Sequence, residues 1–369
     1  MTLRSTAPTS FVPHVSTAEA SSRACSTPDQ HERVEREVER MLVELMTEVG
    51  AVEAVVRERG EASPSLAARI PASFVQFSAA LNELIGDHAD IPAQLRERLG
   101  ARVHDSLQPY VLMTETVERM YTKPCGYAGD YLSIDAVYNE VCGGEAPLGP
   151  IFDRCVLDLP AAKAVRNRRD LLRAKIEATL AAHPDRPVEI TTLACGPARE
   201  VFDVFETLED PTRLFVNLVD IDANALAQVR EEAAQRGLSA QIRLVEANLI
   251  RVALGRDSLP LAEQDLVYSI GLIDYFRDRV VVALMSAVYE LLRPGGQLIL
   301  GNFDVHNPDK AVMDHVLDWR LIHRSEADMD RLFTASAFGR GASAIDFEAE
   351  GVNLFATCER ASGPLQAAK

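Results

Sequence analysis

The sequence has 369 residues, which is long enough for a large core together with an accessory domain. Acidic residues outnumber basic residues by 55 to 38, and the resulting formal charge of −17 argues against a nucleic-acid-binding surface. The N-terminus lacks the apolar segment of a signal peptide, and no apolar run reaches membrane-spanning length. We therefore expect a cytoplasmic protein that binds neither nucleic acid nor membrane.

The cysteines do not suggest a metal or redox site. There are six of them, scattered along the chain, and no pair has the CxxC spacing of a zinc or redox motif. No His/Asp cluster has a ligand spacing either, so we expect no metal.

The first third of the chain is predicted to be helical. Residues 1–28 are rich in Ser, Thr, Ala and Pro and are predicted to be disordered. From about His31 onwards, apolar residues recur every three or four positions, as on one face of a helix. Further helices are expected over 71–85, 92–107 and 109–121, because Pro or Gly stands at each boundary. We therefore expect residues 29–158 to form an all-α accessory domain.

The remainder, residues 159–369, is predicted to be an α/β domain. After a helix over 159–182, five apolar segments alternate with helices, which favours a parallel sheet covered on both faces. The strands are expected over 188–194, 214–219, 241–246, 265–270 and 297–302, and the helices between them over 198–207, 223–236 and 279–292. A closing antiparallel pair near 344–349 and 352–359 would complete a seven-stranded, Rossmann-like sheet.

The end of the first strand carries the strongest functional signal. Small residues over 194–198 form a tight turn between a strand and a helix, which brings backbone N–H groups close to a ligand. Asp220 ends the second strand, where a carboxylate suits the hydroxyls of a ribose. A helix N-cap is the alternative role for Asp220, but Asp222 is better placed for it. These features predict an enzyme that binds a nucleoside.

The order of these features resembles the class I S-adenosylmethionine-dependent methyltransferases over about residues 160–360. The resemblance rests on the turn, Asp220, the polar residue after the third strand and the Leu-Leu-Arg-Pro-Gly-Gly string before the fifth. The chain departs from the family's glycine pattern, since Thr192 replaces a common acid and Ala194 and Ala198 replace two glycines. Alanine restricts the backbone more than glycine does.

A narrower resemblance covers most of the chain. Strings at 121–131, 194–201, 269–276, 301–308 and 318–324 are similar to those of proteins for 3-hydroxypalmitic acid methyl ester biosynthesis. Relatives of this type include enzymes that cyclise S-adenosylmethionine to azetidine-2-carboxylate and release methylthioadenosine. The resemblance implies S-adenosylmethionine as methyl donor, or as sole substrate in the cyclase.

The resemblance also implies which residues contact S-adenosylmethionine. Residues at the strand ends are expected to line the methionine moiety, the ribose, the adenine and the sulfonium: Ala194, Gly196, Asp220, Ile221, Asn248, Leu249, Ser269 and Gly271.

The catalytic candidates come from two regions. The segment 121–131 is either a Gly-Pro loop whose tyrosines cap the core, or a lid whose aromatic faces attract the sulfonium cation. The family resemblance favours the lid, with Tyr127, Asp130 and Tyr131 as contacts. Residues after the fourth and fifth strands are the other candidates: Asp274, Tyr275 and Asn302. His306 is more typical of a solvated loop, and Trp319 and Arg324 of packing or an ion pair.

Three functions remain open from the sequence. The first is methyl transfer to a small-molecule carboxylate or hydroxyl, such as a 3-hydroxy fatty acid or a secondary-metabolite acid. The second is cyclisation of S-adenosylmethionine by attack of its own amine. The third is S-adenosylmethionine binding without catalysis.

Overall fold

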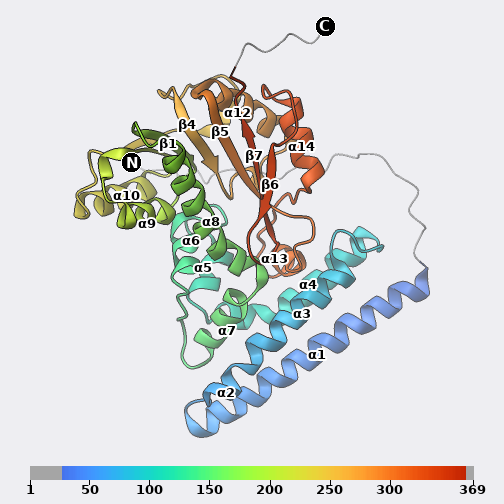
Figure 1. Cartoon of the computed structure of the whole chain (residues 1–369). Coiled ribbons are helices and arrows are strands. Elements are labelled where there is room, and N and C mark those ends of the chain that lie inside the picture. The colour runs from blue at the N-terminus through green and yellow to red at the C-terminus, as the bar shows by residue number, and fades with distance from the viewer. Residues whose placement is uncertain (1–26, 363–369) are drawn as a thin grey trace, which may run out of the picture.

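The computed structural model describes residues 27–362, and the predicted disorder of residues 1–26 lies outside them. Position 28 departs from the prediction, because Pro28 already begins a helix whose N-cap is Thr27. Among the described residues eight helices precede the first strand, and the first seven are α1 (Pro28–Arg59), α2 (Pro64–Ala67), α3 (Arg69–Ile85), α4 (Ala93–Val111), α5 (Thr116–Thr122), α6 (Tyr131–Tyr138) and α7 (Leu148–Leu157). In Figure 1 the long helices α1, α3 and α4 lie below the sheet. Within the described residues, no helix is both long and apolar enough to cross a membrane.

Pro109 does not end a helix, contrary to the prediction. It lies inside α4, which continues to Val111, and α5 begins only at Thr116. A proline inside a helix removes one backbone hydrogen bond and strains the turn before it. Here Leu107 and Val111 on either side are both buried, so packing of the last turn against its neighbours outweighs the local preference.

The sheet agrees with the prediction in strand number and direction. Its strands are β1 (Val188–Leu193), β2 (Leu214–Asp220), β3 (Ile242–Glu246), β4 (Gln264–Ser269), β5 (Leu292–Phe303), β6 (Ala344–Phe347) and β7 (Asn353–Glu359). Their order is β3-β2-β1-β4-β5-β7-β6. The first five are parallel, and β7 runs antiparallel to both β5 and β6.

Helices cover both faces of this sheet (Figure 1). On one face, α8 (Pro160–Ala182), α9 (Arg199–Thr207) and α10 (Ala223–Gln235) share a core with the sheet. On the other face lie α11 (Leu249–Ala253), α12 (Asp278–Leu291) and α14 (Glu326–Ala335). Alternate side chains of one strand enter the two cores, as period-2 geometry requires; Leu218 faces the first and Val219 the second.

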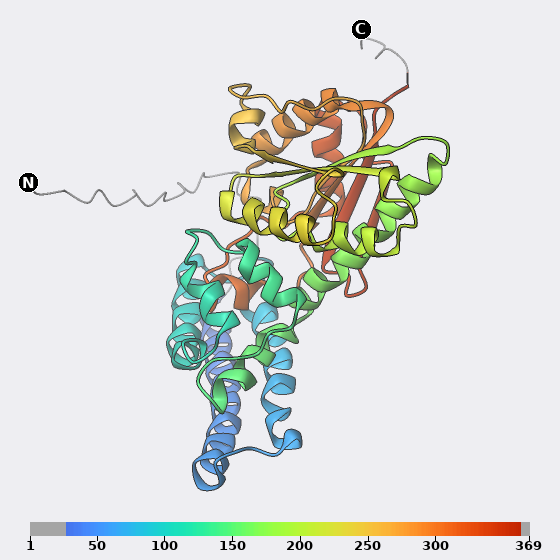
Figure 2. The ribbon, with the colours of Figure 1, turned by 90° about the vertical axis from the view of Figure 1, so that its left-hand side faces the viewer.

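A late segment of the chain belongs to the helical layer. The short helix α13 (Lys310–His315) follows β5, yet its apolar residues share one core with α1, α3 and α4. The carboxylate of Asp309 accepts hydrogen bonds from Ser78 Oγ at 2.8 Å and from Ala161 N at 2.8 Å. Figure 2 shows this orange-red segment among the blue and teal helices. The sheet and the helical layer are therefore joined by a shared core.

Candidate functional site

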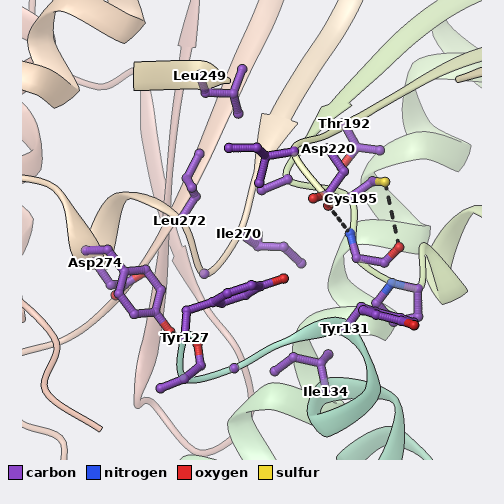
Figure 3. A pocket seen from close by; sticks show the side chains of 18 of the residues that line it. Tyr127, Tyr131, Ile134, Thr192, Cys195, Asp220, Leu249, Ile270, Leu272 and Asp274 are labelled. Carbon is purple, nitrogen blue, oxygen red and sulfur yellow. Dashed lines mark hydrogen bonds between the residues drawn. The ribbon is translucent and has the colours of Figure 1, made fainter. Parts of the chain in front are cut away.

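A pocket of about 360 Å³ lies where the carboxyl ends of β1, β2 and β4 meet the helical layer. This is the edge at which open α/β sheets bind ligands. Figure 3 shows its wall, with Asp220 and Cys195 on the sheet side and Tyr127, Tyr131 and Ile134 on the helical side. Most of the predicted site residues line it: Tyr127, Tyr131, Ala194, Gly196, Asp220, Ile221, Asn248, Leu249, Gly271, Asp274 and Tyr275. Asp130, Ser269 and Asn302 do not.

The turn after β1 owes its shape to three left-handed residues. Ala194, Gly196 and Ala198 have φ angles of 55°, 52° and 48°. Glycine adopts this conformation freely, whereas alanine adopts it at a cost. The two alanines thus keep the backbone path that glycines commonly provide. An added Cβ at Gly196 would stand 4.0 Å from Tyr131 Cβ, which puts the turn directly against the helical side of the pocket.

Asp220 links this turn to β2. Its Oδ2 accepts a hydrogen bond from Gly196 N and its Oδ1 one from Asp222 N, both at 2.9 Å. Burial raises the pKa of this carboxyl, and the backbone N–H donors oppose the rise. Each oxygen keeps a second acceptor site, because a carboxylate has about four in all. Asp222 caps α10 through Asn224 N, as predicted.

The adenine side of the predicted site is apolar and partly open. Ile221 is 59% exposed, and Leu249 is buried beside it in the pocket lining. Asn248 caps α11, with its Oδ1 accepting from Ile250 N and Arg251 N, so its Nδ2 is the atom left to meet a ligand. Ser269 instead donates its hydroxyl to Leu193 O in the sheet.

Several tyrosines line the pocket, among them Tyr127, Tyr131 and Tyr275. Tyr127 is 40% exposed and its hydroxyl donates to Asp222 Oδ2 at 3.4 Å, while Tyr131 opens α6. Tyr275 donates to Ala128 O and accepts from Trp319 Nε1, both at 2.8 Å. A Cβ at Gly129 would stand 2.6 Å from Trp319, so glycine is required for this close contact. The segment before α6 is thereby fastened to the loop after β4.

Two predicted catalytic residues, Asp130 and Asn302, do not line the pocket and instead contact other parts of the protein. Asp130 is fully buried as the N-cap of α6 and pairs with Arg119 at 3.0 Å. Asn302 donates to Ile322 O and accepts from Arg324 Nη1 at 2.8 Å. These contacts satisfy the polar atoms of Asn302 and Oδ1 of Asp130, while Oδ2 of Asp130 is buried without a hydrogen-bond partner.

Asp274 is one of the buried acids of the site. Its Oδ1 accepts from Phe303 N at 2.8 Å, while its Oδ2 is buried without a hydrogen-bond partner. Burial raises the pKa of this carboxyl to about 6, against the opposing effects of Phe303 N and the Arg324 and Arg168 charges. A carboxyl with such a pKa can hold or release a proton near neutrality.

Arg168 and Glu200 also line the pocket, and neither was among the predicted site residues. Arg168 lies in the Arg-rich stretch 163–175, whose other arginines are at least partly exposed, yet Arg168 is 5% exposed. Glu200 accepts from Tyr268 Oη at 2.8 Å, and burial raises the pKa of its carboxyl. A sequence signal for Arg168 exists, because it falls in register with the buried residues Val165 and Leu172.

The chain is similar to solved structures at low sequence identity. A structure described as a possible exported protein of Bordetella parapertussis is 18% identical over 81% of this chain and 99% of that chain, with a TM-score of 0.51. Magnesium protoporphyrin IX methyltransferase from Synechocystis PCC 6803, with S-adenosylmethionine bound, is 14% identical over 67% and 96%, with a TM-score of 0.43. The first likeness concerns the fold alone. No curated protein sequence matches the chain significantly.

A sequence-family model identifies the chain more closely. The model described as "Putative methyltransferase" matches residues 123–352, which is more than half of the chain. The match runs from the tyrosine-rich segment, through the turn after β1, to the start of β7. The resemblance to class I methyltransferases is thereby confirmed, whereas the narrower 3-hydroxypalmitic acid branch stays a prediction. The chain belongs to this methyltransferase family.

Proposed function

We propose that the pocket binds S-adenosylmethionine and that the chain transfers its methyl group to a small-molecule acceptor. The observation that carries the proposal is Asp220, which is held by Gly196 N at 2.9 Å and lines the pocket beside the left-handed turn. Its remaining acceptor sites suit a ribose diol. Ile221, Asn248 and Leu249 form the adjoining wall for an adenine.

The rest of the pocket supports a small, largely apolar acceptor. Beyond the turn, the wall is made mainly by aromatic and aliphatic side chains of the helical layer and of the segments after β4 and β5: Ile134, Tyr138, Val165, Tyr275, Phe303, Trp319 and Leu321. Such a wall excludes water and positions an acceptor carboxylate or hydroxyl, which is most of what methyl transfer needs. A 3-hydroxy fatty acid or a secondary-metabolite acid fits this character. In this proposal, residues 29–158 are the accessory domain, with Tyr127 and Tyr131 in its lid, and 159–369 bind S-adenosylmethionine.

Asp274 favours one alternative. Cyclisation of S-adenosylmethionine to azetidine-2-carboxylate needs a neutral amine, and hence a group that takes its proton. Asp274 lines the pocket with one unpartnered oxygen and a pKa of about 6, which suits that task.

The identity of the nucleoside product tests both functions. Purified protein is incubated with S-adenosylmethionine alone and then with 3-hydroxy fatty acids. S-adenosylhomocysteine formed only with an acceptor supports methyl transfer. Methylthioadenosine formed without an acceptor supports the cyclase and contradicts methyl transfer. Tight binding without either product supports a non-catalytic binding protein.

A binding measurement tests the role of Asp220. Trp319 is the single tryptophan of the chain and lies in the pocket wall, so its fluorescence can report binding of S-adenosylhomocysteine. Asp220→Ala should weaken that binding by about 1–3 kcal/mol, the usual loss for a charged hydrogen bond. Asp210→Ala is the matched control, because Asp210 is an exposed cap outside the pocket lining. An unchanged dissociation constant for Asp220→Ala would remove Asp220 from the site.

A further inference from the structure

Arg168 is a buried cation in the wall of the pocket. It is 5% exposed and belongs to the buried face of α8, together with Val165 and Leu172. Arginine is almost never buried unless its charge is paired. The next residue, Arg169, shows the ordinary arrangement, because its Nε lies 2.5 Å from Asp203 Oδ2.

Arg168 has no such partner among residues 27–362. Its hydrogen bond is a weak one, from Nε to Tyr138 Oη at 3.5 Å, and within this part of the chain no carboxylate forms an ion pair with it. Glu200 and Asp274 also line the pocket, but each has its own donor, Tyr268 Oη and Phe303 N respectively. Burial raises the pKa of both carboxyls, and the Arg168 charge opposes that rise in each, so both interact with the guanidinium through space although neither lies within ion-pair distance of it.

The loop after β4 leaves room for this guanidinium. A Cβ added at Gly271 would stand only 3.3 Å from Arg168 Nη1, and the φ angle of +71° also favours glycine there. Gly271 itself lines the pocket and was predicted to lie near the sulfonium. The terminal nitrogens of Arg168 are therefore packed against the part of the wall where a bound S-adenosylmethionine and its acceptor would meet.

We propose that Arg168 binds a carboxylate of the ligand through its guanidinium. A carboxylate matches the planar fork of arginine with two parallel hydrogen bonds and supplies the direct ion-pair partner that Arg168 lacks. This proposal rests on the proposed function. The carboxylate that Arg168 binds could then come from either of two molecules. One is the amino-acid end of S-adenosylmethionine, and the other is a carboxylic acid acceptor.

The first arm of the test isolates the carboxylate of S-adenosylmethionine. Binding of S-adenosylmethionine and of decarboxylated S-adenosylmethionine, which lacks only that group, is measured by Trp319 fluorescence. Arg168→Met should weaken binding of the first roughly 10- to 100-fold, as for a lost charged hydrogen bond, and leave the second nearly unchanged. Arg168→Lys keeps the positive charge but not the planar fork, so its affinity for S-adenosylmethionine should lie between those of the wild type and Arg168→Met. If Arg168→Met fails to fold, Arg168→Lys is the variant to measure. Arg173→Met is the control on the same helix, because Arg173 faces Asp170 and Glu177 at the surface.

The second arm isolates an acceptor carboxylate. Binding of 3-hydroxypalmitate and of its uncharged methyl ester is measured on the protein saturated with S-adenosylhomocysteine. If the acceptor supplies the carboxylate, wild type prefers the acid, Arg168→Met loses that preference, and the first arm shows no change.

The outcomes separate the two proposals. Loss of discrimination in either arm supports the role of Arg168 and names the source. The role of Arg168 is overturned if Arg168→Met changes the binding of the charged and the uncharged compound of each pair equally, or changes neither. In that case, binding of S-adenosylmethionine by the wild type still upholds the proposed function. Failure of the wild type to bind any of the S-adenosyl compounds overturns both.

Discussion

At the scale of single residues, Ala194 combines a strained backbone with a functional position. Its φ angle of 55° is left-handed, and its side chain lies in the pocket lining. Ala194→Gly should raise the free energy of unfolding by about 1 kcal/mol, because glycine adopts this conformation without the steric cost. Urea denaturation measures the change. Ala178→Gly is the control, because Ala178 is an exposed residue within α8 where the same substitution costs about 1 kcal/mol. A loss of stability in both variants would contradict strain at Ala194.

Asp274 should make stability depend on pH. Burial raises its pKa to about 6, above the value of about 3.9 for an unfolded chain. The native state therefore binds this proton more tightly than the unfolded state, and its contribution to stability falls as the pH rises from about 4 to about 6. Asp274→Asn removes this dependence. Between pH 4 and pH 7, its stability relative to wild type should increase by roughly 2–3 kcal/mol.

Urea denaturation of both proteins at the two pH values gives this difference. The other titrating groups cancel in it, because both proteins contain them. A difference that stays constant from pH 4 to pH 7 would show that Asp274 is not buried as a titrating acid.

The site residues show what a sequence does and does not reveal. Asp220 and Gly196 were predictable, because the end of a strand fixes their place at one edge of the sheet. Asp130 resembles a site residue in the sequence but is buried as a helix cap. Arg168 was missed because its stretch carries many arginines, and only its register with Val165 and Leu172 distinguishes it. Register of a charge with an apolar face is thus a signal for a buried ion.

At the scale of elements, the strands were the easier prediction. Their β-branched and apolar runs are confirmed as strands in number and direction, because buried parallel strands permit few polar residues. The helices α6 and α7 were missed, since the Gly and Pro residues around them favour turns. Helix α6 is instead set by its cap, Asp130, and by residues such as Val137 that it buries. Tertiary packing decided what local preference left open.

Helix α6 offers a test that separates capping from catalysis. Asp130 Oδ1 accepts from Leu132 N and Ser133 N, both at 3.0 Å, and pairs with Arg119. Asp130→Ala should destabilise the protein by about 0.5–2 kcal/mol and weaken ligand binding, because Tyr127 and Tyr131 flank the cap. Asp130→Asn keeps the acceptor and should stay close to wild type in both respects. Thermal unfolding and Trp319 fluorescence measure the two effects. Equal loss of turnover in both variants, with stability retained, would instead make Asp130 a catalytic acid.

At the scale of the whole molecule, the chain crosses between its two parts more than once. Helix α13 comes after β5, yet Val312 and Met313 are buried in the core of the helical layer. Asn82 of α3 donates to Asn307 O and accepts from Ala311 N. The apolar pattern of the sequence does not predict that α13 packs in the helical layer, because an apolar helix face does not specify which neighbouring element it will pack against. The predicted boundary at 158 and 159 therefore does not separate two cores.

This shared core predicts how the molecule unfolds. Loss of the helical layer would expose the apolar face of α13 and leave Asp309 without Ser78, so neither part should remain folded alone. Trp319 fluorescence and far-UV circular dichroism should therefore give coincident urea transitions for the full chain. Asn82→Ala, which removes the contacts with Asn307 and Ala311, should shift both transitions together to lower urea. Glu83→Ala is the control, because Glu83 is exposed on the same helix. Two separate transitions, with only one moved by Asn82→Ala, would show that the helical layer and the sheet fold independently.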